Sequence, residues 1–139
     1  MSAETRCWFE KALISGPGKC AQAKRLEIGE RLVCVCRSPA AAKLCDRYLS
    51  LLRKNARFVF RQGDARDSIL SNYQEIRLQC GGLLGLAAMI YGEQADTRFE
   101  ISTLLATVED EGQGIEYTRL DRIIPRIAAY NPRPHRKKR

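Results

Sequence analysis

Six cysteines are the residues of this chain best suited to chemistry. They stand at positions 7, 20, 34, 36, 45 and 80 of 139, and five of them fall between Cys20 and Cys80. The chain has a single histidine, His135, near its C-terminus. A metal or redox site in this chain is therefore expected to use sulfur ligands alone, since the body of the sequence offers no imidazole.

Iron–sulfur clusters are held mainly by cysteine thiolates, four of them in the common 2Fe–2S and 4Fe–4S types. The sequence has none of the C-x₂₋₄-C pairs that structural zinc sites use, and no compact ferredoxin run. Clusters accept ligands scattered over a fold, so we expect an iron–sulfur cluster, 4Fe–4S by preference, with zinc as the alternative. Two readings without metal stay open: a Cys34/Cys36 redox pair, and thiols that only fill the core.

Local context ranks the thiols as ligands. Cys20 follows a Gly-Pro-Gly turn, where the backbone can approach a cluster closely. Cys80 precedes two glycines and an apolar run, so we expect it to open a helix, whose free N–H groups lower a thiol pKa. Cys36 and Cys45 flank a helix start at Ser38-Pro39. The expected ligands are Cys20, Cys36, Cys45 and Cys80, with Cys34 as the substitute and Cys7 the least favoured.

The positive charge is concentrated at the C-terminus. The chain carries a net charge of +8, and residues 131–139, NPRPHRKKR, hold five cations and no acid. Such a segment can contact phosphates or an acidic protein. The expected contact residues for nucleic acid or a partner are Arg133, Arg136, Lys137, Lys138 and Arg139.

Hydrophobic periodicity predicts a mainly α fold with two short strands. A serine cap followed by proline starts a helix at Ser38 that runs through Lys54. The strands are expected over 32–36, with Cys34 and Cys36 on one face, and over 57–61. Further helices are expected over 2–14, 83–91, 97–111 and 118–130, the last one kinked at Pro125, and 69–79 is left open between helix and extended chain.

We expect residues 1–130 to form one globular domain containing the cysteine-rich stretch 20–80, followed by the basic tail 131–139. The N-terminal residues have acids and no apolar signal core, and no run approaches the roughly 20 apolar residues of a membrane span. These features favour a cytoplasmic protein whose thiols stay reduced. The predicted function is a small iron–sulfur protein, acting as electron carrier, redox sensor or accessory subunit of a larger redox assembly, and not a self-contained enzyme. The alternative is a metal-free helical binding module that uses its basic tail.

Overall fold

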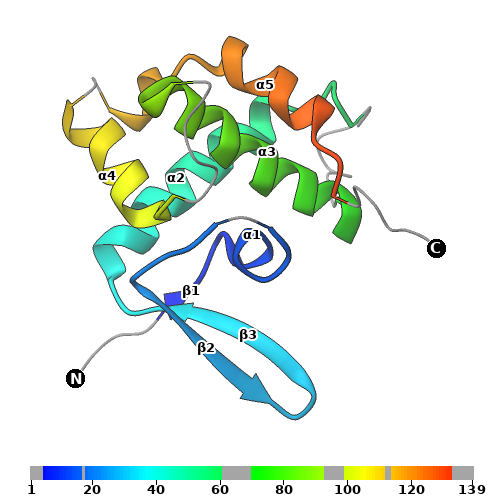
Figure 1. The fold of residues 1–139 in the computed structure, drawn as a ribbon, viewed down its shortest axis with the longest axis vertical. Coiled ribbons are helices and arrows are strands. Elements are labelled where there is room, and N and C mark those ends of the chain that lie inside the picture. The colour runs from blue at the N-terminus through cyan, green and yellow to red at the C-terminus, as the bar shows by residue number, and fades with distance from the viewer. Residues whose placement is uncertain (1–4, 17, 61–69, 93–98, 112–113, 133–139) are drawn as a thin grey trace.

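A computed structural model describes residues 5–16, 18–60, 70–92, 99–111 and 114–132. Five helices and three short strands occur in these residues (Figure 1). In chain order they are β1 (Thr5–Arg6), α1 (Glu10–Ser15), β2 (Ala23–Ile28), β3 (Arg31–Cys36), α2 (Pro39–Asn55), α3 (Asn72–Tyr91), α4 (Ile101–Glu111), the 3-10 turn η2 (Ile115–Tyr117) and α5 (Leu120–Ala129). The prediction of a mainly α fold with short strands is confirmed.

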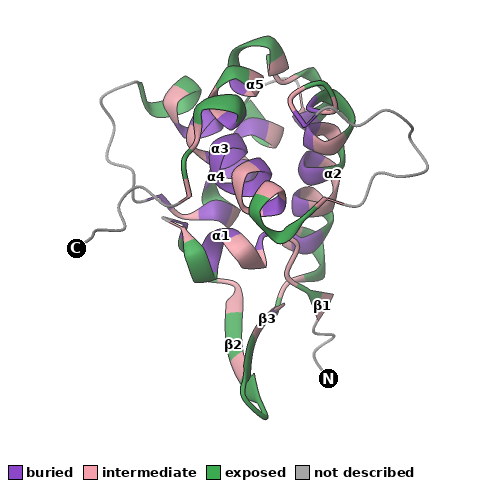
Figure 2. Ribbon diagram, turned by 90° about the vertical axis from the view of Figure 1, so that its right-hand side faces the viewer, coloured by how far each residue is buried: buried purple, intermediate pink, exposed green. Residues whose placement is uncertain are grey.

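The strands form an antiparallel sheet in the order β1-β3-β2. Gly29 and Glu30 connect β2 to β3, and Gly29 has a φ of 64°, which favours glycine in this tight turn. The hairpin projects away from the helices, and α1 lies between the sheet and the helical layer (Figure 1). Buried residues gather in the helical part, while the hairpin tip is exposed (Figure 2).

The predicted strand at 32–36 is confirmed as β3, but the one at 57–61 is wrong over its described residues. Residues 57–60 form turns directly after α2, and the Val59 N–H donates to the Ala56 carbonyl at 3.0 Å. Phe58 is 94% exposed whereas Phe60 is 8% exposed. No strand lies beside these described residues to complete a ladder; Phe60 joins the hydrophobic core and Val59 packs against it, while Phe58 faces solvent.

The helices begin and end largely where periodicity predicted. Ser38 caps α2 by accepting the Ala41 N–H at 3.1 Å. The open stretch 69–79 is resolved in favour of helix from Asn72, where Ser71 and Gln74 form a reciprocal capping box. The predicted helix over 2–14 is confirmed only from Glu10, because Thr5 and Arg6 pair with β3 instead.

The glycines of α3 allow two helices to pack closely against it. A Cβ at Gly81 would lie 2.6 Å from the Ile127 Cα, and a Cβ at Gly82 would collide with Leu52. The buried Tyr48 hydroxyl donates to the Gly82 carbonyl at 2.8 Å. Gly81 and Gly82 thus let α5 and α2 approach α3 closely on two adjacent faces.

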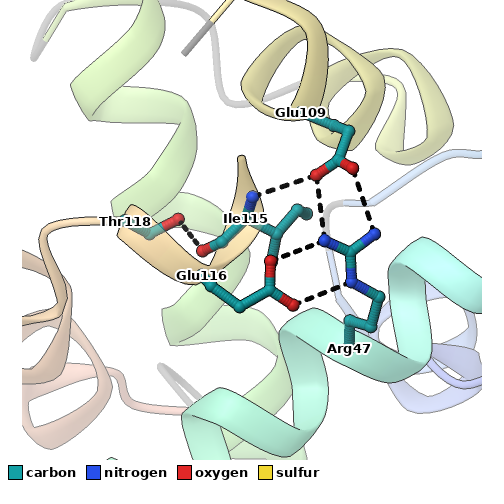
Figure 3. Close-up of polar contacts among 5 residues, drawn as sticks. All are labelled: Arg47, Glu109, Ile115, Glu116 and Thr118. Atoms are coloured by element: carbon teal, nitrogen blue, oxygen red, sulfur yellow. Dashed lines mark hydrogen bonds and ion pairs between the residues drawn. The ribbon is translucent and has the colours of Figure 1, made fainter. Parts of the chain in front are cut away.

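One arginine joins α2 to α4 and η2. The Arg47 guanidinium donates to both Glu109 oxygens at 3.1 Å and to Glu116 at 2.8 and 2.5 Å (Figure 3). Glu109 also accepts the Ile115 N–H at 3.0 Å. The hydrogen bonds from Arg47 lower the pKa of both carboxyl groups, so all three side chains stay charged at neutral pH.

A second polar chain runs inward from the partly exposed Arg53. Arg53 donates twice to Glu75, at 2.7 Å each, and Gln79 donates to the same carboxylate at 2.9 Å. The Gln79 side chain then accepts the Ala12 N–H at 3.1 Å. This chain fixes α1 against α3 and α2, and so sets the position of the segment before α1.

Over the described residues, no helix is long and apolar enough to cross a bilayer.

Candidate functional site

Four cysteines from four separate segments line one small cavity. Cys7 follows β1, Cys20 lies between α1 and β2, Cys36 ends β3, and Cys45 lies in the second turn of α2. The free space amounts to about 10 Å³, room for one water molecule. Apolar side chains form much of the remaining wall, including those of Phe9, Leu13 and Ile101.

Three of the cavity thiols, those of Cys7, Cys20 and Cys45, are held in the neutral form. Burial raises the pKa of Cys7 to about 12 although a hydrogen bond from the Phe9 backbone lowers it. Burial likewise raises the pKa of Cys45, and the charges of Cys20, Cys7 and Cys36 raise it further. Burial also raises the pKa of Cys20. Neutral buried thiols are poor nucleophiles, so the arrangement does not favour a catalytic thiolate.

Cys36 is positioned by the start of α2. Its Sγ donates to the Ser38 carbonyl at 3.2 Å, and its side chain is 6% exposed. Cys45 follows in the same helix and is 8% exposed. The expectation that the helix start at Ser38-Pro39 brings these two thiols together is confirmed, because both line the cavity.

Glu100 fastens the loop that carries Cys20. Its carboxylate accepts the Ala21 N–H at 2.5 Å and the Thr103 N–H at 2.8 Å, while the Ile101 N–H donates to the Lys19 carbonyl at 2.7 Å. Burial alone would raise the pKa of Glu100, but hydrogen bonds from Thr103, Ala21 and Ser102 lower it to about 2. Sequence reasoning missed this residue; the only local signal is an acid that directly precedes a helix.

Cys34 lies beside the cavity and not in its lining. It is 4% exposed, and its N–H donates to the Glu10 carboxylate at 2.6 Å. Burial raises its pKa, Glu10 adds to that rise, and Arg25 opposes it. The prediction that Cys34 and Cys36 share a face is confirmed, since both are buried while the alternate residues Val33 and Val35 are only partly buried.

Cys80 lies elsewhere, in the middle of α3. The expectation that it opens a helix is wrong, because α3 begins at Asn72 and continues unbroken through Gly81 and Gly82. A Cβ at Gly16 would collide with the Cys80 Sγ, and Tyr130 hydrogen-bonds to the thiol. Burial raises the pKa of Cys80. The structure therefore brings Cys20, Cys36 and Cys45 together with Cys7 and leaves Cys80 in a separate part of the core.

Cys7 separates the cavity from an open groove. The groove has a volume of about 530 Å³, and Arg6, Cys7 and Trp8 line both spaces. The Arg6 guanidinium lies 4.3 Å from the centre of the Trp8 ring. Residues 6–8 thus form the wall between the cavity and this groove.

Within the residues that the structure describes, no group of three or more histidine, cysteine, aspartate or glutamate side chains is arranged to hold a metal ion. Ligation by the cavity thiols therefore requires their side chains to move. His135 and the predicted contact residues Arg133, Arg136, Lys137, Lys138 and Arg139 lie outside the described residues.

Comparison of the chain with known protein families, with curated proteins and with solved structures gives no match.

Proposed function

We propose that this protein binds an iron–sulfur cluster through Cys7, Cys20, Cys36 and Cys45, and serves as an electron carrier, redox sensor or accessory subunit. The observation that carries the proposal is the convergence of these four thiols on one small, largely apolar cavity. Four cysteines are the usual ligand number of both common cluster types.

The separation of the ligands favours a cluster over zinc. Structural zinc sites take their cysteines in pairs from short loops, whereas here each thiol comes from a different segment of the fold. Zinc remains the alternative occupant, since four thiolates also suit that ion. Both require deprotonated thiols, so metal uptake releases protons and becomes more favourable as the pH rises.

The first experiment measures iron, zinc and acid-labile sulfide per chain in protein purified anaerobically, together with the visible spectrum. We expect iron with matching sulfide and a brown colour. Cys7→Ala, Cys20→Ala, Cys36→Ala and Cys45→Ala should each lose most of the iron, because each removes one of four ligands.

Cys80→Ala is the control, since that thiol is buried in α3 and does not line the cavity. We expect this variant to keep its iron. Equal loss from Cys80→Ala and Cys7→Ala would contradict the proposed ligand set, zinc without iron would make the site structural, and protein free of metal would leave the thiols as core residues.

A further inference from the structure

The start of α4 supplies hydrogen-bond donors to the loop that carries Cys20. The first four N–H groups of a helix have no partner within that helix. In α4 the Ile101 N–H donates to the Lys19 carbonyl at 2.7 Å, and the Ser102 N–H hydrogen-bonds to the Cys20 sulfur. The next two N–H groups donate to Glu100, one to its carboxylate at 2.8 Å and one to its carbonyl at 2.9 Å. The Cys20 sulfur thus takes the place of a capping oxygen on α4.

The Cys20 sulfur also has a backbone and a hydroxyl partner. The Gln22 N–H hydrogen-bonds to it, within a turn that the Ala23 N–H closes by donating to the Cys20 carbonyl at 3.2 Å. The Ser102 hydroxyl hydrogen-bonds to the same sulfur and lies 2.7 Å from a Glu100 carboxylate oxygen. Because a hydroxyl has a single proton, it can donate to only one of these two acceptors at a time. A sulfur that gains negative charge competes better for that proton.

The thiols of Cys7 and Cys36 are held in other ways. The Cys7 sulfur has a hydrogen bond from the Phe9 backbone, within its own segment, and Cys36 donates its proton to the Ser38 carbonyl at 3.2 Å. The donors at Cys20 come from α4 as well as from its own turn. Hydrogen bonds to the cysteine sulfurs are among the features that set the reduction potential of an iron–sulfur cluster. The surroundings of Cys20 therefore bear on redox properties, and not only on the position of the thiol.

We propose that the donors around Cys20 raise the reduction potential of the bound cluster, and that Ser102 is the residue whose side chain tunes it. This inference rests on the proposed function, since it requires a cluster bound through Cys20. Reduction by one electron from an external donor adds one negative charge, which the cluster shares with its cysteine sulfurs. N–H and O–H groups that point at one of these sulfurs stabilise the reduced form more than the oxidised form. Two of the three donors belong to the backbone, so the Ser102 hydroxyl is the one that a substitution can remove.

The test compares reduction potentials of the cluster-loaded full chain, measured by protein-film voltammetry under argon. Ser102→Ala should shift the potential to a more negative value, because the reduced cluster loses a hydrogen bond. Ser102→Thr keeps the hydroxyl and should keep the parent potential. Thr107→Val is the matched control, since it removes a hydroxyl further along α4 from a residue that does not line the thiol cavity. We expect this variant to keep the parent potential as well.

Amide hydrogen exchange, followed by NMR in reduced and metal-free protein, tests the hydrogen bonds themselves. The N–H groups of Ser102 and Gln22 should exchange severalfold faster in Cys20→Ala than in the parent, because both lose their acceptor. The Ile101 N–H, whose acceptor is a backbone carbonyl of the same loop, should keep its rate and so show that the loop stays in place. Cys7→Ala should leave all three rates unchanged.

Equal potentials for the parent and Ser102→Ala overturn the inference, and so does an equal shift in Thr107→Val. Loss of iron from Ser102→Ala alone would make Ser102 a support of the ligand loop and not a tuning residue. Unchanged amide exchange in Cys20→Ala would show that the sulfur is not the acceptor. Parent protein that binds no iron refutes the proposed function and this inference with it, whereas a bound cluster whose potential does not respond to Ser102→Ala refutes the inference alone.

Discussion

At the scale of single residues, the six cysteines differ in environment: four are buried, whereas Cys7 and Cys20 are only partly buried. Cys7 lines the cavity with three other thiols, while the fully buried Cys80 hydrogen-bonds to Tyr130. The local sequence around each thiol instead favours Cys80 as a ligand and Cys7 least of all. Cys7 was placed on a helix that in fact begins three residues later, and its position depends on the pairing of Thr5 and Arg6 with β3, which leaves no local signal.

The neutral state of the thiols predicts a loss of stability at alkaline pH. In the unfolded chain a cysteine ionises near pH 9, whereas burial raises the pKa of folded Cys7 to about 12. Between these values the unfolded state releases a proton that the folded state retains. The contribution of Cys7 to the unfolding free energy of metal-free, reduced protein should therefore be constant well below pH 9 and fall as the pH rises from 9 toward 12.

Denaturant titrations at a series of pH values under argon measure this fall. Burial also raises the pKa of Tyr130 to about 12, so tyrosines contribute to the same slope. The contribution of Cys7 is the difference between the parent and Cys7→Ala, which should lose less stability over this range. Identical slopes for the two proteins would show that folded Cys7 ionises as it does in the unfolded chain.

At the scale of elements, the packing of α5 on α3 depends on the absence of a side chain at Gly81. An added Cβ would lie 2.6 Å from the Ile127 Cα and 2.9 Å from the Arg126 carbonyl oxygen, and backbone atoms cannot turn aside. Alanine gains up to about 1 kcal/mol in helix propensity. The forced separation of the helices costs about 1–3 kcal/mol. Gly81→Ala should therefore lower the midpoint of thermal unfolding.

Gly85→Ala provides the comparison within the same helix. Its Cβ would meet Arg126 Cγ and Ile123 Cγ2 at 3.2 Å, so most of its contacts can adjust. We expect the smaller loss of stability at Gly85, measured by calorimetry on both variants. A larger loss at Gly85 than at Gly81 would mean that α5 yields easily and that its contact with α3 is loose.

The same helix shows why local sequence gave an incomplete picture of the elements. Two adjacent glycines normally weaken a helix, and they led to the expectation of a helix start at Cys80. Tertiary contacts outweigh that preference here, since Gly81 and Gly82 let α5 and α2 approach α3 on two sides. The caps at Ser38 and the alternation of 32–36 were predicted correctly because a serine cap and a two-residue period are local signals.

At the scale of the whole molecule, the fold class and most helices could be read from periodicity, while the convergence of the thiols could not. Cys7, Cys20, Cys36 and Cys45 meet only because the sheet, α1 and α2 pack against one another, and Glu100 ties the Cys20 loop to α4. Three of the four had been selected from their neighbours in sequence. The fourth, Cys7, reaches the cavity because of the path that the chain takes between β1 and α1, which the local sequence does not indicate.

The basic tail makes a separate prediction for the whole chain. Residues 131–139 hold five cations and no acid, so any binding of nucleic acid should weaken steeply with salt and disappear when they are deleted. Fluorescence anisotropy with duplex DNA and with an unstructured RNA measures this at several ionic strengths. Affinity that survives the deletion would assign the binding to the folded part of the chain and refute the tail as a contact.

The smallness of the thiol-lined cavity also has a kinetic consequence. Space for one water molecule cannot admit an inorganic cluster, so loading of the proposed cluster would require the wall at residues 6–8 or another side to open and then reclose. The rate of such opening governs release as well as uptake. A cluster seated behind the closed wall should exchange slowly with chelators, at a rate that does not depend on chelator concentration once opening limits the reaction.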